Sequence, residues 1–276
     1  MKHDKVWIKI ISAEAAFVIA FVVIAIIFNP SPGEFLKIRT ANFMTKKAMI
    51  LIACIFTKYI DKRKLSFLGL DFEKDRSIRI FFIGCLIAAV QMLFIDSAAY
   101  ISGFVSDGSF NFSIEIIFMG IGIFLVHTVI TGISEEMLFR GYILGNLLTK
   151  YNETKAVIIS AALFTIIHVS SHMTIVNYTD IFLMGIIFAE LFLITKSLYM
   201  PIGVHFFFDF VQEEIFMIEN VNENPYALIK FNVNNELFLG GRAVTSKIEI
   251  LFVISEIVIL IFIYLYKARL KADNNK

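Results

Sequence analysis

The sequence predicts an all-α protein, a polytopic integral membrane bundle of about eight transmembrane helices that forms a single membrane domain over residues 1–276. Two of the three supporting observations concern composition. The chain is 58% hydrophobic and 18% charged, whereas soluble domains are about half apolar and a quarter charged. Its mean hydropathy is +0.78. The third observation is that the apolar residues gather into stretches of about 20 residues, the length a helix needs to cross the hydrocarbon core.

Eight apolar stretches are predicted to cross the membrane. They lie at residues 7–28, 41–60, 78–100, 115–134, 156–172, 180–196, 201–218 and 248–266. The first follows Lys2 and Lys5 and shows no cleavage site, so we expect a retained signal anchor. The longest polar connection, 219–247, is expected to be an external loop.

The basic residues of the short loops predict a multi-pass protein of the cell membrane with both termini in the cytoplasm. The 61–79 loop is rich in Lys and Arg, whereas 97–114 has none. One segment, 29–47, fits this orientation poorly, because it should be external and yet is basic. Its basic residues are Lys37, Arg39, Lys46 and Lys47.

Net charge and cysteine content exclude several classes of function. The formal net charge is +1, so no overall field favours nucleic acid as a partner. The only cysteines, Cys54 and Cys85, lie in apolar stretches and are expected to be core residues rather than a disulfide or a metal pair. Composition makes the lipid bilayer the expected partner.

The stretch GISEEMLFRGY, residues 132–142, carries two glutamates and an arginine inside an apolar region. Three charges facing lipid would cost roughly 8–10 kcal/mol, so they must face a protein interior, a wet cavity or each other. Glu136 and Arg140 are four apart and are predicted to pair on one helix face. Glu135 is turned about 100° away and is free to enter a different environment.

Glu135 and His168 are expected to lie at the same depth. They are placed symmetrically about the polar turn TKYNETK, and facing residues of an antiparallel helix hairpin have a constant sum of positions. His205 and Asp209 are four apart and share a face of a later helix. All four groups converge if the helices predicted at 180–196 and 201–218 meet at a recessed turn, and Pro201 makes such a turn plausible.

Other polar residues in the apolar regions carry weaker expectations. His127 lies two turns before Glu135, and a packing role is expected for it. His172 is expected to be an exposed histidine at a helix end. Glu190 has no obvious partner in the sequence.

The four converging groups are suited to hydrolysis of an acyl bond. A glutamate beside a histidine in a recessed site can activate water. A second histidine with a carboxylate can polarise a carbonyl or stabilise an oxyanion. The same set, Glu135, His168, His205 and Asp209, could instead hold Zn²⁺ or another divalent metal, and both routes stay open at this point. The sequence has no Gly-x-Ser-x-Gly nucleophile, no Ser/Lys pair and no His-Glu-x-x-His zinc helix.

Three ordered motifs resemble those of a known family. They are Glu135-Glu136-x-x-x-Arg140, Phe164-x-x-x-His168 and His205-x-x-x-Asp209, all within a core at about residues 115–215. The family is the CAAX protease and bacteriocin-processing (Abi) membrane proteases, which includes the type II CAAX prenyl endopeptidases. The resemblance implies an eight-helix intramembrane bundle around a cavity that opens to cytosol and lipid.

The resemblance also implies a role for each motif residue. Glu135 would be the water-activating base, assisted by His168. His205 and Asp209 would steady the oxyanion or complete a metal site, and Glu136 and Arg140 would support Glu135. The family commonly has Asn where this chain has Asp209. An ionised Asp would repel an oxyanion, so its pairing with His205 or its binding to a metal is expected instead.

The sequence therefore predicts a membrane endopeptidase that cleaves small peptides or the ends of membrane-associated proteins, with or without a divalent metal. Processing of a bacteriocin, pheromone or leader peptide fits the resemblance. One alternative is a non-proteolytic membrane protein that binds peptides or confers bacteriocin immunity. Another is a small transporter with a proton relay, which the lack of an internal repeat disfavours.

Overall fold

The computed structural model describes residues 2–31, 34–71, 73–110, 112–169, 173–218, 225–233 and 243–274. Within these ranges the chain is predominantly helical, with π-helical and 3-10 segments (η1–η5) between the α-helices. The elements are α1 (Lys2–Phe28), α2 (Phe35–Ile55), η1 (Phe56–Ile60), η2 (Leu65–Leu68), α3 (Lys74–Ile101), β1 (Val105–Phe110), α4 (Ile114–Ile116), η3 (Ile117–Ile123), α5 (Phe124–Glu136), η4 (Met137–Leu144), α6 (Gly145–Leu147), α7 (Glu153–Ile166), α8 (Ile175–Thr195), α9 (Tyr199–Phe210), η5 (Val211–Ile215), β2 (Phe216–Ile218), β3 (Ile229–Val233) and α10 (Ala243–Asn274).

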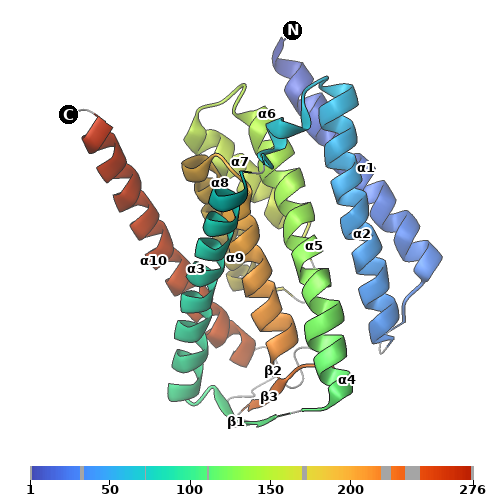
Figure 1. Ribbon diagram of the computed structural model, residues 1–276, viewed down its shortest axis with the longest axis vertical. Helices are drawn as coiled ribbons and strands as arrows, with labels where there is room; N and C mark the ends of the chain where they lie inside the picture. The colour runs from blue at the N-terminus through green and yellow to red at the C-terminus, as the bar shows by residue number, and fades with distance from the viewer. Residues whose placement is uncertain are drawn as a thin grey trace.

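The long helices run side by side in a bundle (Figure 1). The α1–α2 pair and α10 lie at opposite edges, with α3, α5, α8 and α9 between them, and both chain ends lie at the end of the bundle away from the strands. The main core joins α2, η4, α7 and α8 through side chains such as Met49, Phe139, Tyr142 and Phe192. The helical bundle predicted from composition is therefore confirmed.

The prediction of eight transmembrane helices is not confirmed. Four helices in the described part of the chain are long and apolar enough to cross a membrane: Lys5–Phe28, Asp75–Ile101, Ile175–Thr195 and Ile248–Asp273. The other predicted spans do not form single long α-helices. Those at 41–60, 115–134 and 201–218 are divided by π-helical segments, and that at 156–172 becomes a 14-residue helix that ends at Ile166.

A small sheet adds to the all-α prediction. Its three short strands have the order β1-β3-β2, with β1 antiparallel and β2 parallel to β3. The sheet joins the connection after α3 to the segment after α9, and it lies at the lower end of the bundle in Figure 1. The external loop predicted at 219–247 contains β3, and most of its other residues lie outside the described ranges.

A close helix crossing fixes the position of α9. Gly203 lies against the backbone of α3, where a Cβ atom would overlap the carbonyl oxygen of Phe81. Because no side chain separates the two helices at this point, α9 is held next to α3 along the turn that carries His205. The two cysteines, Cys54 and Cys85, are free, as the sequence predicts.

Candidate active site

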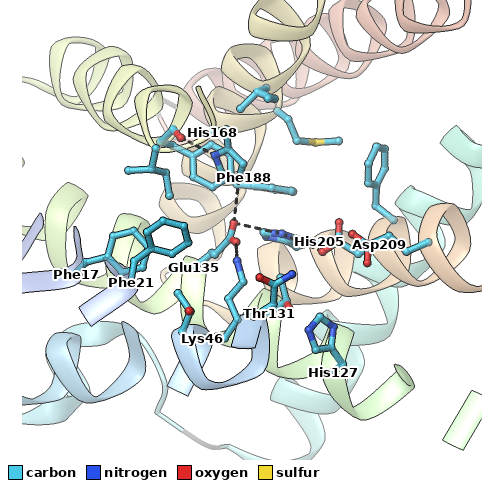
Figure 2. Close-up of a pocket in the computed structure, with 18 of the residues that line it drawn as sticks. Phe17, Phe21, Lys46, His127, Thr131, Glu135, His168, Phe188, His205 and Asp209 are labelled. Atoms are coloured by element: carbon cyan, nitrogen blue, oxygen red, sulfur yellow. Dashed lines mark hydrogen bonds and ion pairs between the residues drawn. The ribbon is translucent and has the colours of Figure 1, made fainter. Parts of the chain in front are cut away.

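A cavity of about 740 Å³ lies among α1, α2, α5, the end of α7, α8 and α9. This volume is within the range of roughly 300–1,000 Å³ that is typical of ligand sites. One wall is apolar and includes Phe17 and Phe21 of α1 and Met184 of α8. The opposite wall is polar and carries the side chains of α2, α5 and α9 that Figure 2 shows around Glu135.

The predicted pair of Glu136 and Arg140 is present and closed to solvent, with Glu136 Oε2 and Arg140 Nε lacking a hydrogen-bond partner among the described residues. Arg140 Nη1 lies 2.9 Å from Glu136 Oε1, and both side chains are fully buried. Arg140 Nη2 donates to the carbonyl oxygen of Gly185 at 3.1 Å. The guanidinium also lies over two aromatic rings, 4.3 Å from the centroid of Phe164 and 5.0 Å from that of Phe188. Buried charges with this many partners hold α5, α7 and α8 together.

His205 connects this closed pair to the cavity. Its Nδ1–H donates to Glu136 Oε1 at 2.9 Å, since a carboxylate oxygen only accepts. On the other side of the ring, Nε2 lies 3.4 Å from Asp209 Oδ2 and 3.6 Å from Glu135 Oε2. Phe188 stacks on the imidazole at 5.0 Å between centroids. The ring is therefore fixed on one edge and faces two acidic groups on the other.

Glu135 presents its two carboxylate oxygens to different groups. Oε1 accepts a hydrogen bond from Lys46 Nζ. Oε2 is buried and has no hydrogen-bond partner in the described part of the chain. It faces His168 Nε2 at 3.8 Å and His205 Nε2 at 3.6 Å (Figure 2). Both separations are too long for direct hydrogen bonds, and a water molecule is what commonly joins polar groups at such distances.

His168 is oriented by the backbone of α7. Its Nδ1–H donates to the carbonyl oxygen of Phe164, four residues earlier, at 2.8 Å. A neutral ring bonded in this way carries its lone pair on Nε2, the atom that faces Glu135. The sequence predicts His168 within the spanning helix 156–172, whereas α7 ends at Ile166 and His168 lies just beyond it. The predicted common depth of Glu135 and His168 agrees with the 3.8 Å separation of their side chains.

Local helix geometry brings these groups together. Glu136 is the last residue of α5, and the next eight residues form the π-helical segment η4. Wide turns of this kind often occur at functional sites. One turn before Glu135, Gly132 lets α9 approach, and a Cβ atom there would lie 3.4 Å from the carbonyl oxygen of Ile202 and 3.7 Å from Cβ of His205.

The structure thus brings together all four residues predicted from the motifs, Glu135, His168, His205 and Asp209, with Glu136 and Arg140 behind them. The pairing of Asp209 with His205 is one of the two arrangements expected for an Asp at this position. His127 lines the same cavity and packs on Phe43, with ring centroids 6.3 Å apart.

Two weaker expectations have different outcomes. Glu190, for which the sequence shows no obvious partner, pairs with Lys267 of α10 at 2.7 Å, a contact between helices far apart in sequence. His172 lies outside the described residues.

Sequence reasoning missed Lys46. It is separated from Glu135 by 89 positions, and no periodic pattern links them. The signal was the poor fit of segment 29–47 to the predicted orientation. Two of its basic residues turn toward the cavity: Lys46 binds Glu135, and Arg39 Nη1 lies 2.5 Å from Glu213 Oε2. Both charges form ion pairs inside the protein, so these residues are poor indicators of how the chain is oriented in the membrane.

The arrangement of the donor side chains bears on the predicted divalent metal. In the part of the chain that the structure describes, no group of three or more His, Cys, Asp and Glu side chains is arranged to hold a metal ion. Lys46 already places a positive charge on Glu135 Oε1, so a divalent ion would have to bind Oε2, which faces His168 and His205, against the repulsion of that ammonium. The donor arrangement does not favour Zn²⁺, and metal dependence stays a prediction.

Part of the chain matches a known protein family. Residues 117–211 match the family described as type II CAAX prenyl endopeptidase Rce1-like. The matched region runs from η3 to the first residue of η5 and contains all three motifs. No curated protein matches the chain.

Proposed function

We propose that the protein is an intramembrane endopeptidase of the Rce1-like CAAX protease family, which residues 117–211 match, and that Glu135 activates a water molecule in its site. Its substrates would be small peptides or the ends of membrane-associated proteins. The observation that carries the proposal is the buried Glu135 Oε2, without a hydrogen-bond partner among the described residues, and facing two imidazole nitrogens across gaps of 3.6 and 3.8 Å.

The gap between Glu135 Oε2 and His168 Nε2 suits a single water molecule. Both atoms accept hydrogen bonds when His168 is neutral, and a water molecule has two O–H bonds to donate. A water held in this way has its oxygen lone pairs directed away from both acceptors and toward the cavity. Such positioning lowers the entropic cost of attack on a bound carbonyl.

The reaction proceeds through a tetrahedral intermediate. Glu135 Oε2 takes a proton from the water as its oxygen bonds to the carbonyl carbon, and the π electrons of the carbonyl move to its oxygen. The proton is then delivered to the amide nitrogen, with His168 positioned to assist. The C–N bond breaks, and the products are a carboxylic acid and an amine. His205 holds the far side of the site through its bonds to Glu136 and Asp209.

The lining of the cavity suits a peptide substrate that enters from an apolar environment. Phe17, Phe21 and Met184 give one wall the character of lipid, whereas Gln212 and Asn42 on the other wall can bind peptide groups. A membrane-associated peptide has both kinds of surface.

The proposal is tested with purified protein in detergent and a pool of internally quenched ten-residue peptides analysed by mass spectrometry. Wild type is expected to release fragments, and Glu135→Gln is expected to lose cleavage by about a hundredfold or more. Glu115→Gln is the matched control, since Glu115 is an exposed glutamate of α4. Equal cleavage by wild type and Glu135→Gln, or no cleavage of any peptide by wild type, would contradict the proposal.

A further inference from the structure

The proposed reaction leaves one charge without a partner. As water attacks, negative charge develops on the carbonyl oxygen of the scissile bond, and hydrogen-bond donors aimed at that oxygen supply a large part of catalysis. Of the two imidazoles that face Glu135, His168 already uses its Nδ1–H on the carbonyl oxygen of Phe164. Glu135 and Asp209 carry carboxylates, and His205 uses its Nδ1–H on Glu136.

Lys46 supplies the missing donors. An ammonium group carries three N–H bonds and no acceptor. The structure gives one of them a partner within the described residues, Glu135 Oε1. The lysine side chain is 21% exposed and lines the cavity, so the remaining N–H bonds lie beside the position of the attacking water. Figure 2 shows the side chain extending from α2 to the Glu135 carboxylate.

The two carboxylate oxygens of Glu135 then have different roles. Lys46 binds Oε1, which leaves Oε2 toward His168 and His205. An ammonium that touches one oxygen of the base is within reach of a carbonyl whose carbon is attacked by water held at the other oxygen. The same contact neutralises the Glu135 charge that would otherwise repel the oxyanion.

We propose that Lys46 is a catalytic residue that donates a hydrogen bond to the carbonyl oxygen of the scissile peptide bond as that oxygen becomes an oxyanion. This inference rests on the proposed peptidase function. No proton leaves Lys46 in the step: the water proton goes to Glu135, the carbonyl electron pair goes to the oxygen, and the ammonium stabilises the new negative charge. When the C–N bond breaks, the oxygen returns to a carbonyl and the hydrogen bond weakens.

The test compares substitutions at two neighbouring lysines. Lys46→Met keeps the length of the side chain and removes the donors. Its kcat on the best-cleaved quenched peptide is expected to fall by about 100- to 1,000-fold, while KM changes only a few-fold. Lys46→Arg is expected to recover part of the loss, because a guanidinium keeps the charge and the donors. Lys47→Met is the control, since Lys47 is exposed and lies over the Phe43 ring at 4.2 Å.

A second measurement separates this role from a structural one. A phosphinate pseudopeptide carries an oxyanion at the position of the scissile carbonyl. Lys46→Met is expected to weaken its binding by the same factor as kcat, and Lys46→Gln, which keeps a neutral N–H donor, by less. Should Lys46→Met prove poorly folded, Lys46→Gln and Lys46→Arg carry the comparison.

The outcomes distinguish the inference from the proposed function. If Glu135→Gln is inactive and Lys46→Met keeps wild-type kcat and phosphinate affinity, Lys46 is not the donor, and the peptidase function stands. If Lys46→Met is faster than wild type, Lys46 restrains the base and the inference is wrong. If Glu135→Gln cleaves as well as wild type, the proposed function itself fails.

Discussion

The two adjacent glutamates at the end of α5 have opposite surroundings. Glu136 is fully buried in a closed cluster, where Arg140 and His205 bind the same carboxylate oxygen at 2.9 Å. Glu135 lines a cavity of about 740 Å³, and its Oε2 faces two histidines at distances too long for direct hydrogen bonds. The first region is tightly bonded, and the second leaves room for a reactant.

This difference shows how one helix end can serve two purposes. Successive residues of a helix point about 100° apart, so neighbouring carboxylates enter different environments. A charge pair buried among helices contributes to their position, whereas a carboxylate oxygen that faces two imidazoles in a cavity can exchange a proton with a bound water molecule. We therefore expect changes in the Glu135 region to affect activity and changes in the Glu136 region to affect stability.

The largest expected effect is on activity, from His168→Ala. This substitution removes the nitrogen that faces Glu135 Oε2, and we expect kcat to fall by about 100- to 10,000-fold, the range for a general acid–base group. The thermal midpoint of unfolding in detergent should change little, because His168 lies beyond the end of α7. The control is Val169→Ala, an exposed neighbour. A large fall in thermal midpoint, with kcat unchanged, would show that His168 stabilises the fold and takes no part in the reaction.

The next effect is on stability, from Arg140→Met. Removal of the guanidinium leaves the buried Glu136 carboxylate without its main partner, and breaking a buried pair costs about 3–5 kcal/mol. Denaturant unfolding in mixed micelles measures the loss. The double variant Glu136→Gln/Arg140→Met removes both charges and should recover much of it. An Arg140→Met protein as stable as wild type would mean that the closed cluster does not hold the helices.

A smaller effect is expected from Gly203→Ala. The added methyl group meets the Phe81 carbonyl of α3, so α9 must shift, and overpacking of this kind costs about 1–3 kcal/mol. Because His205 is on the same turn, kcat should fall together with stability. Gly122→Ala is the matched control, since the nearest atom to its Cβ would be 3.9 Å away. If both variants behave alike, the α3–α9 contact does not position the site.

The smallest expected effect is that of metal removal. Lys46 places a positive charge beside Glu135, and its repulsion disfavours a divalent ion at the neighbouring Oε2, so dialysis against a chelator should leave the cleavage rate unchanged. Metal content is measured by mass spectrometry before and after dialysis. Loss of activity that returns on addition of Zn²⁺ would restore the metal alternative, with Glu135 Oε2, His168 and His205 as its nearest donors.

The sequence was informative where the contacts follow helix spacing. The pair Glu136–Arg140 and the level placement of Glu135 with His168 follow from four-residue spacing and hairpin symmetry. The contact of Lys46 with Glu135 depends on how α2 packs on α5, which no local pattern encodes.

The limits of the fold prediction have similar causes. Hydropathy identifies apolar stretches, but it does not show where a helix ends or widens into π-helical turns. The stretch 156–172 therefore includes three residues, 167–169, that the structure places beyond α7, and 201–218 runs into β2. The sheet pairs β1 with β3, segments more than 100 residues apart, and such pairing leaves little local signal.

The central claim is that Glu135 activates water rather than attacking the peptide itself, and single-turnover cleavage in H₂¹⁸O tests it most directly. With enzyme in excess over a quenched peptide, the new carboxyl group of the first-turnover product should contain ¹⁸O from solvent, and the enzyme fragment that holds Glu135 should stay unlabelled. An unlabelled product together with ¹⁸O in the Glu135 carboxylate would show an acyl-enzyme intermediate and would contradict the account.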